Sequence, residues 1–456
     1  MNLPVDLTTA SREELLHLIS QLLERIAALE ARLAELEGQP PPTDALAEKK
    51  PPSWAKANRP ARAPKPRKKR AQGFARRREE PTHRVEHALA ECPHCQVPLT
   101  DGRVRSCRQV ITLPRIRVRV TEHVVLERTC PKCQKQWTPK PDWSAITLGR
   151  QRIGLSVQSE VVVLREECRL PFGVVQRYLK WRYGLHLSVG ELVALVHGVA
   201  ARGKGEYEGL REELRASAVV QGDETGWREN GRNGYLWSFS TPKVRYFLYR
   251  QSRGGAVVEE VLGEEFDGVL GSDFYGAYNV YQGPHQRCWT HLLRAIHQLK
   301  ERYPQNQAVC EWAQGVRAVY ERAQAYPGPD PSLPGVVQQA QRVKEQRQYE
   351  EELWRLCRSY VKTEAPMSVL CQRVERFLPE LFTFVADPRV PADNNGAERS
   401  LRPQVVSRKI SGGTRSPSGS ETKSILASLF STWRLQGRDP YQAVRRVLTQ
   451  SQPAPV

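Results

Sequence analysis

Two aspartates near the middle of the chain each follow a short apolar segment that has the composition of a buried strand. Asp223 comes directly after 217–222, and Asp273 comes directly after 268–272. A single aspartate after a strand is most often a turn residue or a helix N-cap. Two of them in matching positions are harder to explain in that way, and carboxylate oxygens are the ligands that Mg²⁺ prefers.

The segments around these aspartates predict the strands that carry them. Two β-rich segments, 235–240 and 244–249, and a predicted helix near 256–262 lie between them. Three meandering strands, a helix and a fourth strand are the opening order of an RNase H-like fold. We therefore expect an α/β core in which Asp223 and Asp273 lie side by side at strand ends. Two divalent cations roughly 4 Å apart at such a site activate a nucleophile and stabilise the leaving oxygen in phosphodiester chemistry.

A third carboxylate normally completes such a site, and the candidates downstream are Asp387, Asp393, Glu398 and Glu421. The segment 393–403 is the densest polar cluster in the C-terminal third. If this segment is helical, its i, i+4 spacing places Asn394, Glu398 and Arg402 on one face. A glutamate between asparagine and arginine suits a metal and phosphate site. The alternative is a surface helix with an i, i+4 salt bridge.

Two Cys-Pro-x-Cys knuckles have the composition of a zinc site. Cys92 and Cys95 form the first, and Cys130 and Cys133 form the second. Four thiolates suit tetrahedral zinc, and a closed set of four indicates one structural Zn²⁺. The segments 110–113 and 118–126 between the knuckles have strand character, so we expect a zinc ribbon. A redox dithiol is the weaker alternative because no thioredoxin-like pattern surrounds either pair.

The stretch between Asp273 and Glu398 holds 124 residues, too many for one strand and a crossover. Its parts 292–326 and 336–380 have helical spacing, so we expect an all-helical insertion there. Cys288 and His291 lie at its entrance. They offer two zinc ligands, and with only two in view a hydrogen-bonding or packing role is favoured.

Four segments resemble those of the insertion sequence 66 family of DDE transposases: 223–227 (DETGW), 272–278 (SDFYGAY), 288–291 (CWTH) and 394–399 (NNGAER). The two knuckles and an N-terminal heptad helix occur in the family's order, so the resemblance covers most of the chain. It implies that Asp223, Asp273 and Glu398 are the catalytic acids and hold two Mg²⁺ or Mn²⁺ ions. The chain departs from the family before the knuckles, where a longer arm rich in proline and arginine replaces a short basic stretch.

Residues 11–37 predict self-association. Their apolar side chains alternate spacings of four and three, the a/d pattern of a two-stranded coiled coil. These residues are Leu15, Ile19, Leu22, Ile26, Leu29, Leu33 and Leu36. The alternative is an amphipathic helix packed on its own chain, and the narrow apolar stripe favours the coiled coil.

Residues 39–80 are rich in proline and hold thirteen Lys or Arg against four Asp or Glu, so they cannot bury a core. We interpret the segment as a DNA-binding arm, with a solubilising linker as the alternative. The basic residues expected to contact DNA there are Lys68, Lys69, Arg70, Arg76 and Arg77.

Residues 155–200 predict three helices with short breaks, and Ser188 is the expected N-cap of the third. They form either a helix-turn-helix, with Arg177, Lys180 and Arg182 facing phosphates, or a packing unit. In the C-terminal part, the residues expected to hold DNA near the carboxylates are Arg399, Arg402, Arg408 and Lys409.

The net charge of +19 over 456 residues suggests a polyanionic partner, because basic surfaces release counterions when they bind phosphate backbones. A solvated basic surface is the alternative. No apolar run approaches the roughly 20 residues of a membrane span, and the first residues lack the pattern of a signal peptide. The expected location is therefore the cytoplasm, at the nucleoid of a prokaryote.

Together these features predict a DNA transposase that cuts the ends of its element and joins them to target DNA. It would act as a homodimer or higher oligomer on double-stranded DNA, with accessory proteins encoded by the element as further candidate partners. The rivals are a domesticated, inactive DNA-binding protein and a structure-specific nuclease. The predicted domains are a coiled coil (11–37), a basic arm (38–82), a zinc ribbon (88–140), a helical DNA-binding region (150–210), the first part of the catalytic core (216–292), the helical insertion (293–385) and the last part of the core (386–450).

Overall fold

The computed structural model describes Ser11, Glu13 and residues 19–28, 78–100, 102–113, 116–148 and 151–450. The chain divides into two compact units, Met1–Thr112 and Leu113–Val456. This boundary falls between the two cysteine knuckles, inside the predicted zinc domain.

In the first unit, residues 19–28 are helical, and Ile19, Leu22 and Ile26 are each about half exposed. These three belong to the predicted heptad stripe. The other stripe positions lie outside the described residues, so the coiled coil stays a prediction. The five basic residues of the arm, from Lys68 to Arg77, also lie outside the described residues.

The two knuckles close into the same tight backbone turn. The N–H of Gln96 donates to the Cys92 carbonyl, and the N–H of Gln134 donates to the Cys130 carbonyl, both at 2.9 Å. Both glutamines have a φ of 57°, which is uncommon for a residue with a side chain. The repeat of this conformation indicates that both knuckles are built to present their cysteines in the same way.

The strands of the predicted zinc domain lie elsewhere than expected. An antiparallel pair, β1 (Arg128–Thr129) and β2 (Gln136–Trp137), flanks the second knuckle. The segments 110–113 and 118–126 are not strands, so that prediction was wrong. Their apolar side chains are exposed, and strand propensity takes effect only where a neighbouring strand and a buried face support it.

Three helices follow, as predicted: α2 (Leu155–Glu166), α3 (Phe172–Tyr183) and α4 (Val189–Arg215). Ser188 caps α4 as expected. Its hydroxyl accepts the Glu191 N–H, and the Glu191 carboxylate accepts the Ser188 N–H, which satisfies two donors that a helix start leaves unpaired. The last turns of α4 continue past the predicted end and pack against the sheet through Tyr207, whose hydroxyl donates to the Phe247 carbonyl at 2.9 Å.

A five-stranded sheet forms the centre of the second unit, in the order β5-β4-β3-β6-β7. The first three strands are antiparallel neighbours, and the last two continue the sheet parallel to β3. They are β3 (Val219–Glu229), β4 (Arg232–Ser240), β5 (Arg245–Arg250), β6 (Val269–Ser272) and β7 (His285–Arg287). Helix α5 (Ala256–Leu262) forms where the sequence predicts it.

The first strand of the sheet is longer than predicted, and Asp223 lies within it rather than at its end. Asn230 and Gly231 have φ values of 48° and 81°, as in the type I′ turns that join twisted hairpin strands. β3 therefore stays paired with β4 as far as Glu229. Its parallel pairing with β6 ends at Gln221, so Asp223 stands just beyond that pairing.

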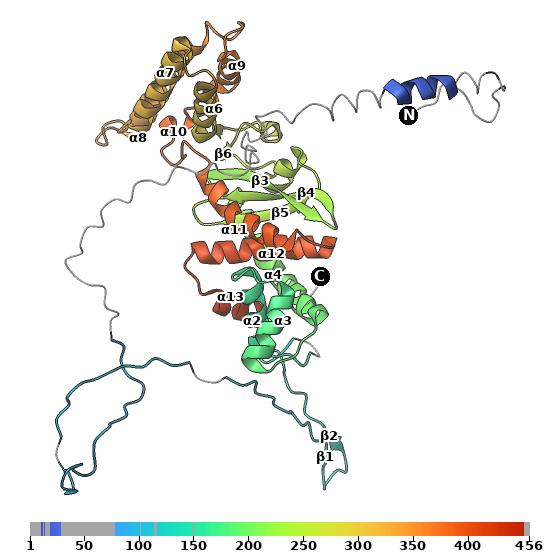
Figure 1. The fold of residues 1–456 in the computed structure, drawn as a ribbon, viewed down its shortest axis with the longest axis vertical. Coiled ribbons are helices and arrows are strands. Elements are labelled where there is room, and N and C mark those ends of the chain that lie inside the picture. Colours follow the sequence, from blue (N-terminus) through green and yellow to red (C-terminus); the bar gives the residue numbers. More distant parts are fainter. Residues whose placement is uncertain are drawn as a thin grey trace. The chain divides into compact units, whose positions relative to one another are not determined.

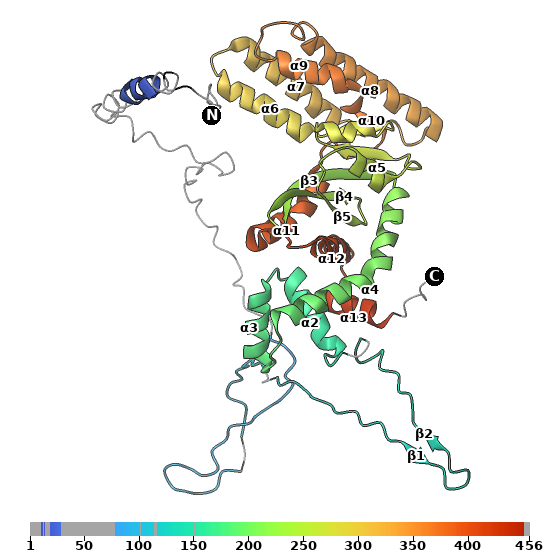
Figure 2. The ribbon, with the colours of Figure 1, turned by 90° about the vertical axis from the view of Figure 1, so that its right-hand side faces the viewer.

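Helices cover both faces of the sheet (Figures 1 and 2). Alternate residues of β4 point to opposite faces. Leu236 packs in a cluster with residues of α11 (Asn395–Ser411) and α12 (Pro417–Leu435), whereas Trp237 belongs to a different cluster, which includes residues of α5. Figure 2 shows α12 end-on beneath the sheet.

Helix α12 also covers the edge strand β5 with hydroxyl groups. Alternate N–H groups of the strand donate to hydroxyls spaced four residues apart on the helix. The pairs are Arg245 with Thr432 (3.0 Å), Phe247 with Ser428 (2.8 Å) and Tyr249 with Ser424 (2.9 Å). Two strand residues span about 6.6 Å and four helix residues span about 6 Å, so the two ladders stay in step. The helix thereby occupies an edge that could otherwise pair with another chain.

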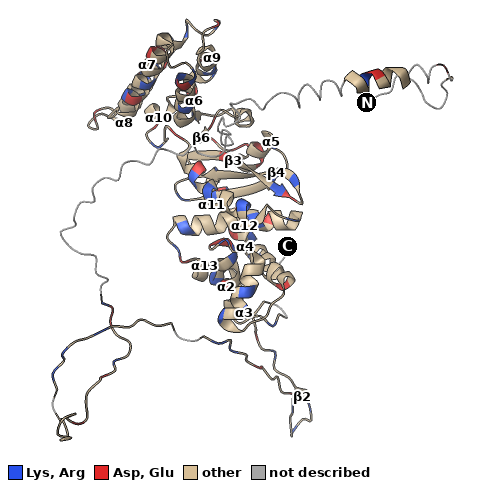
Figure 3. Cartoon of the chain, viewed as in Figure 1, with Lys and Arg blue, Asp and Glu red and all other residues tan. Residues whose placement is uncertain are grey.

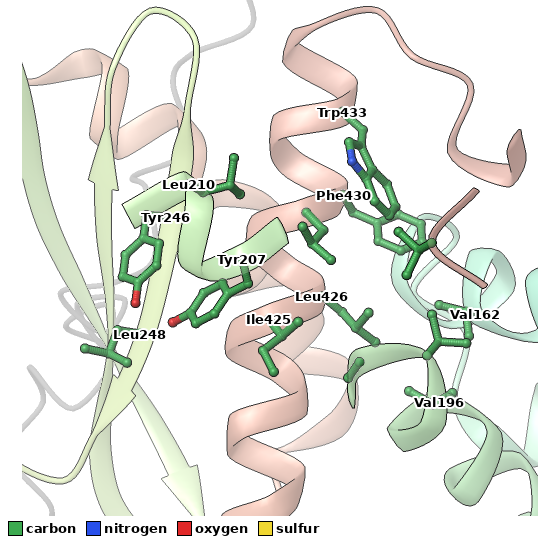
Figure 4. Packing of buried hydrophobic residues seen from close by; sticks show 14 of the residues in the cluster. Val162, Val196, Tyr207, Leu210, Tyr246, Leu248, Ile425, Leu426, Phe430 and Trp433 are labelled. Atoms are coloured by element: carbon green, nitrogen blue, oxygen red, sulfur yellow. The ribbon is translucent and has the colours of Figure 1, made fainter. Parts of the chain in front are cut away.

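The opposite side of α12 packs on the helices that precede the sheet (Figure 4). Phe430 and Trp433 belong to the same hydrophobic cluster as Val162 of α2 and Val196 of α4. Helix α13 (Pro440–Thr449) joins the same core. The helices before the sheet and the helices at the C-terminus therefore form one packed body.

The insertion is all-helical, as predicted, and its own core includes Trp289, Trp312 and Phe382. Its helices are α6 (Trp289–Arg302), α7 (Gln307–Gln324), α8 (Gly335–Cys357), α9 (Ser368–Phe377) and α10 (Thr383–Ala386). Across the described part of the chain, none of the helices is long and apolar enough to cross a bilayer.

Candidate active site

The parallel register places the two aspartates level with each other. Gln221 on β3 pairs with Gly271 on β6. Asp223 lies two residues after Gln221, and Asp273 lies two residues after Gly271. The strand pairing therefore brings both carboxylates to neighbouring positions on the sheet, as the sequence predicts, although only Asp273 follows a strand end.

Asn394 fixes the start of α11 beside this pair. It is buried, and its side-chain N–H donates to the Gly222 carbonyl at 2.7 Å. Its backbone N–H donates to Cys288 Sγ at 3.1 Å. The start of α11 is thus bonded to the residue before Asp223, and Glu398 lies in the first turn of that helix.

Buried serines hold the next turn of α11 on the sheet. Ser238 is the cross-strand partner of Asp223, and its hydroxyl lies 2.7 Å from that of Ser400 on α11. The Ser240 hydroxyl lies 3.0 Å from the same group. Hydrogen bonds on both sides of Glu398 therefore fix the helix to β3, which carries Asp223, and to the neighbouring strand β4.

The other two predicted acids lie close enough to Asp223 for their charges to act on it. Its pKa is raised to about 7 by burial and by the negative charges of Glu224, Asp273 and Glu398. Carboxylates that share a partly buried site repel one another, so some of them take up protons unless a cation is bound. Oxygen ligands from β3, from the end of β6 and from α11 suit one or two Mg²⁺ or Mn²⁺ ions.

The other candidates for the third carboxylate have different partners. Asp387 forms an ion pair with Arg389 at 2.7 Å, and Glu421 forms one with Lys204 at 3.1 Å. Asp393 accepts hydrogen bonds from the backbone and side chain of the residue two positions later. Among the four, Glu398 is the one whose charge acts on Asp223.

Glu224 belongs to the site and was missed from the sequence. Its side chain is 3% exposed and forms an ion pair with Arg253 at 2.6 Å. It also accepts the Tyr278 hydroxyl at 2.6 Å. The Arg253 guanidinium lies 3.9 Å from the centre of the Tyr275 ring. The Glu224 carboxylate is therefore already engaged by Arg253 and Tyr278, which makes it a positioning residue. A second acid directly after Asp223 is the sequence signal that could have found it.

Arg287, at the end of β7, holds the backbone of Asp273 in place. It is 1% exposed, and it donates to the Asp273 carbonyl at 3.0 Å and to the Ser272 hydroxyl at 3.1 Å. It also forms an ion pair with Glu380, near the end of the insertion. These contacts connect the backbone of Asp273 to the insertion, and no short sequence motif predicts them.

The basic residues predicted near the carboxylates lie along α11 (Figure 3). Arg399, Arg402 and Lys409 are exposed. Arg408 is half-buried, and its guanidinium donates to the Thr225 hydroxyl at 3.0 Å and to the carbonyl of the next residue. Arg408 therefore anchors α11 to β3, while the other three are available to a ligand.

Helix α3 presents a second basic surface. Arg177 and Lys180 are exposed, as a contact with DNA requires. The neighbouring Trp181 is 74% exposed, which the sequence reasoning overlooked. An exposed aromatic ring among cations is typical of nucleic-acid contacts.

The first cysteine of each knuckle has a lowered pKa, which favours the thiolate form that binds metals. The pKa of Cys92 is lowered by backbone hydrogen bonds from Cys95 and His94. The equivalent bonds in the second knuckle lower the pKa of Cys130. Each knuckle thus fits half of a tetrahedral zinc site. The knuckles fall in different compact units, so their union at one zinc ion stays a prediction.

Comparison with known proteins identifies the family of the chain. The chain is 24% identical over 434 residues to the uncharacterized protein y4qI of Sinorhizobium fredii, a match that covers 87% of the chain and 76% of that protein. It is also 24% identical over 291 residues to the uncharacterized protein y4jD of the same organism, covering 58% of the chain and 56% of that protein. The family model for the IS66 family of transposases matches residues 150–422, more than half of the chain and the part that contains all three carboxylates. The chain therefore belongs to the IS66 family of transposases.

Proposed function

We propose that this transposase cuts DNA at the ends of its element and joins the freed ends to target DNA by a DDE mechanism. The observation that carries the proposal is the convergence of Asp223, Asp273 and Glu398, which together with Glu224 and burial raises the pKa of Asp223 to about 7. The strand order β5-β4-β3-β6-β7, with three antiparallel strands followed by two parallel ones, supports an RNase H-like core.

The protein contributes mainly the positioning of oxygen ligands. β3 and β6 fix Asp223 and Asp273 level with each other, and Asn394 bonds the start of the Glu398 helix to the same strand. When bound, Mg²⁺ or Mn²⁺ activates the attacking oxygen and stabilises the leaving oxygen. In-line displacement at phosphorus needs little further covalent help, so exact placement supplies most of the rate.

The reaction has two displacements at phosphorus. Water first attacks the phosphodiester at an element end, which breaks the bond to the 3′-oxygen and leaves a 3′-hydroxyl. That hydroxyl then attacks a target phosphodiester and displaces the target's own 3′-oxygen. Arg402 is exposed, one helical turn after Glu398, and this spacing lets it contact a phosphate close to the carboxylates.

Strand transfer needs two ends held together, which a dimer provides. The residues assigned to this task are the heptad segment 11–37 for pairing, and Arg177 and Lys180 on α3 for binding the ends. The basic arm adds non-specific affinity through counterion release. The four knuckle cysteines would hold one structural zinc ion.

The test is incubation of the full-length protein with labelled element ends, a target plasmid and Mg²⁺, with products sized on a gel. We expect cleaved ends and end–target joints. Asp223→Asn, Asp273→Asn and Glu398→Gln should each abolish both products while DNA binding persists, because each keeps the shape but removes a charged ligand. Arg389→Gln is the matched control, since this exposed residue pairs with Asp387 away from the site.

Three results would change the proposal. Cleavage without joined products would make the protein a nuclease. Binding without metal-dependent cleavage by the wild type would make it a DNA-binding protein that has lost the reaction. Near-normal cleavage by one of the three acid variants would remove that residue from the site.

A further inference from the structure

Cys288 and His291 form a second cluster with Glu398, which is one of the three acids. Cys288 stands at the N-cap of α6, His291 lies in its first turn, and Glu398 lies in the first turn of α11. The sulfur, the imidazole nitrogen and the carboxylate oxygen all lie within 4.8 Å of one another. The starts of two helices thus bring three different donor types to one point.

Two hydrogen bonds hold this arrangement, one between backbone groups and one from a backbone N–H to the Cys288 sulfur. The Trp289 N–H donates to the Ala392 carbonyl at 3.0 Å, and the Asn394 N–H donates to Cys288 Sγ at 3.1 Å. The first bond joins the start of α6 to the segment before α11, and the second joins the sulfur to the start of α11. The cluster is therefore largely pre-formed.

Two polar atoms of the cluster lie close together without forming a hydrogen bond to each other. His291 Nδ1 and Glu398 Oε1 are 3.8 Å apart, which is too long for a hydrogen bond. Both atoms are buried and have no hydrogen-bond partner within the described part of the chain. Buried polar atoms are seldom left in this state. A cation between them would satisfy both at once.

The donor set indicates which cation. Thiolate and imidazole ligands favour zinc and related transition metals, whereas Mg²⁺ takes oxygen ligands. A coordinated thiol gives up its proton outright, and the Asn394 N–H, 3.1 Å from Cys288 Sγ, would then stabilise the thiolate.

We propose that Cys288, His291 and Glu398 bind one zinc ion, in a position distinct from the one that Asp223 and Asp273 offer to magnesium. Three protein ligands leave the fourth coordination position open. The ion would fix one oxygen of Glu398 and so hold its carboxylate toward the two aspartates. That last consequence rests on the proposed function, whereas the binding of zinc does not.

The test is the zinc content of the full-length protein, purified under reducing conditions and dialysed without chelator. Cys288→Ala and His291→Ala should each lower the content by about one ion per chain. Cys310→Ala is the matched control, because it removes a half-buried thiol elsewhere in the insertion and should leave the zinc content unchanged. Cobalt substitution gives a second readout: the thiolate-to-cobalt absorption should fall in Cys288→Ala and persist in Cys310→Ala.

Wild-type zinc content in both cluster variants would overturn the proposal and leave a hydrogen-bonded or packed cluster. Should Cys288→Ala not fold, His291→Ala decides alone, because that side chain is 29% exposed and its loss leaves the core intact. The measurement contains no DNA. A protein that fails to cut DNA would therefore contradict the proposed function without altering this result.

Discussion

Replacing Glu166 with glutamine should strongly destabilise the second unit, because it removes one half of a buried ion pair. Glu166 on α2 and Lys423 on α12 lie 2.8 Å apart, and their side chains are 6% and 8% exposed. They are 257 positions apart in the sequence. The pair therefore ties the helices before the sheet to the helix that covers it.

Leaving one member of a buried pair without its partner typically costs about 3–5 kcal/mol. We expect Glu166→Gln to fall in this range, because the Lys423 ammonium stays buried. The double variant Glu166→Gln/Lys423→Met should recover much of the loss, since methionine removes the stranded charge. Glu167→Gln is the matched control: its partner on α12 is Arg434, the two side chains are 32% and 42% exposed, and pairs of this kind contribute about 0–1 kcal/mol.

The loss should also depend on pH. Burial alone would raise the pKa of Glu166, but the charges of Lys423 and Arg165 outweigh it and hold the pKa below its ordinary value of 4.5. A carboxyl whose folded pKa is depressed stabilises the fold fully above the unfolded pKa, and this contribution fades as the pH falls through the folded pKa. The difference between wild type and Glu166→Gln should therefore be largest at neutral pH and shrink below 4.5.

Urea unfolding followed by tryptophan fluorescence measures these differences, with the wild type and all variants compared at neutral and acidic pH. If Glu166→Gln loses no more stability than Glu167→Gln at neutral pH, the pair does not join the two layers as described. A loss that stays constant as the pH falls would show that the carboxylate charge is not its source.

Three further predictions follow. Purified, reduced protein should hold a zinc ion at the two knuckles, and chelation should unfold residues 90–137 while the sheet stays folded; elemental analysis that finds no zinc would count against this. Deleting residues 1–80 should weaken DNA binding most at low salt and flatten its salt dependence, because fewer counterions are released; an unchanged slope in a binding titration would make the arm a linker. Ser428→Ala should cost about 1–3 kcal/mol in urea unfolding, because it leaves the buried Phe247 N–H without its acceptor. Ser418→Ala, exposed at the start of the same helix, should cost little, and equal losses would refute the role of the hydroxyl ladder.

Local signals predicted the elements that depend on local physics. The N-cap Ser188 marked the start of α4, and the apolar segments around Asp223 and Asp273 marked two strands that the structure contains. The turn of the long hairpin was also readable, because Asn230-Gly231 is a strong signal for a type I′ turn. Recognising it would have placed Asp223 inside its strand rather than at the end.

Long-range contacts were not readable in this way. The pairing of Glu166 with Lys423 and the bond from Asn394 to Gly222 join residues far apart in the sequence, and no periodicity or spacing encodes them. The same limit explains the Cys288 cluster. Two ligands were visible in the sequence, and the third, Glu398, reaches them only because the starts of α6 and α11 meet.

The central claim is that Asp223, Asp273 and Glu398 share a divalent cation, and iron-directed cleavage of the protein backbone tests it most directly. Fe²⁺ bound in place of Mg²⁺ produces radicals with ascorbate and peroxide, and these cut the chain only beside the ion. We predict cuts in all three segments, suppressed by excess Mg²⁺ and lost together in Asp223→Asn. Cuts at one segment alone, or cuts that Asp223→Asn leaves unchanged, would contradict the shared site.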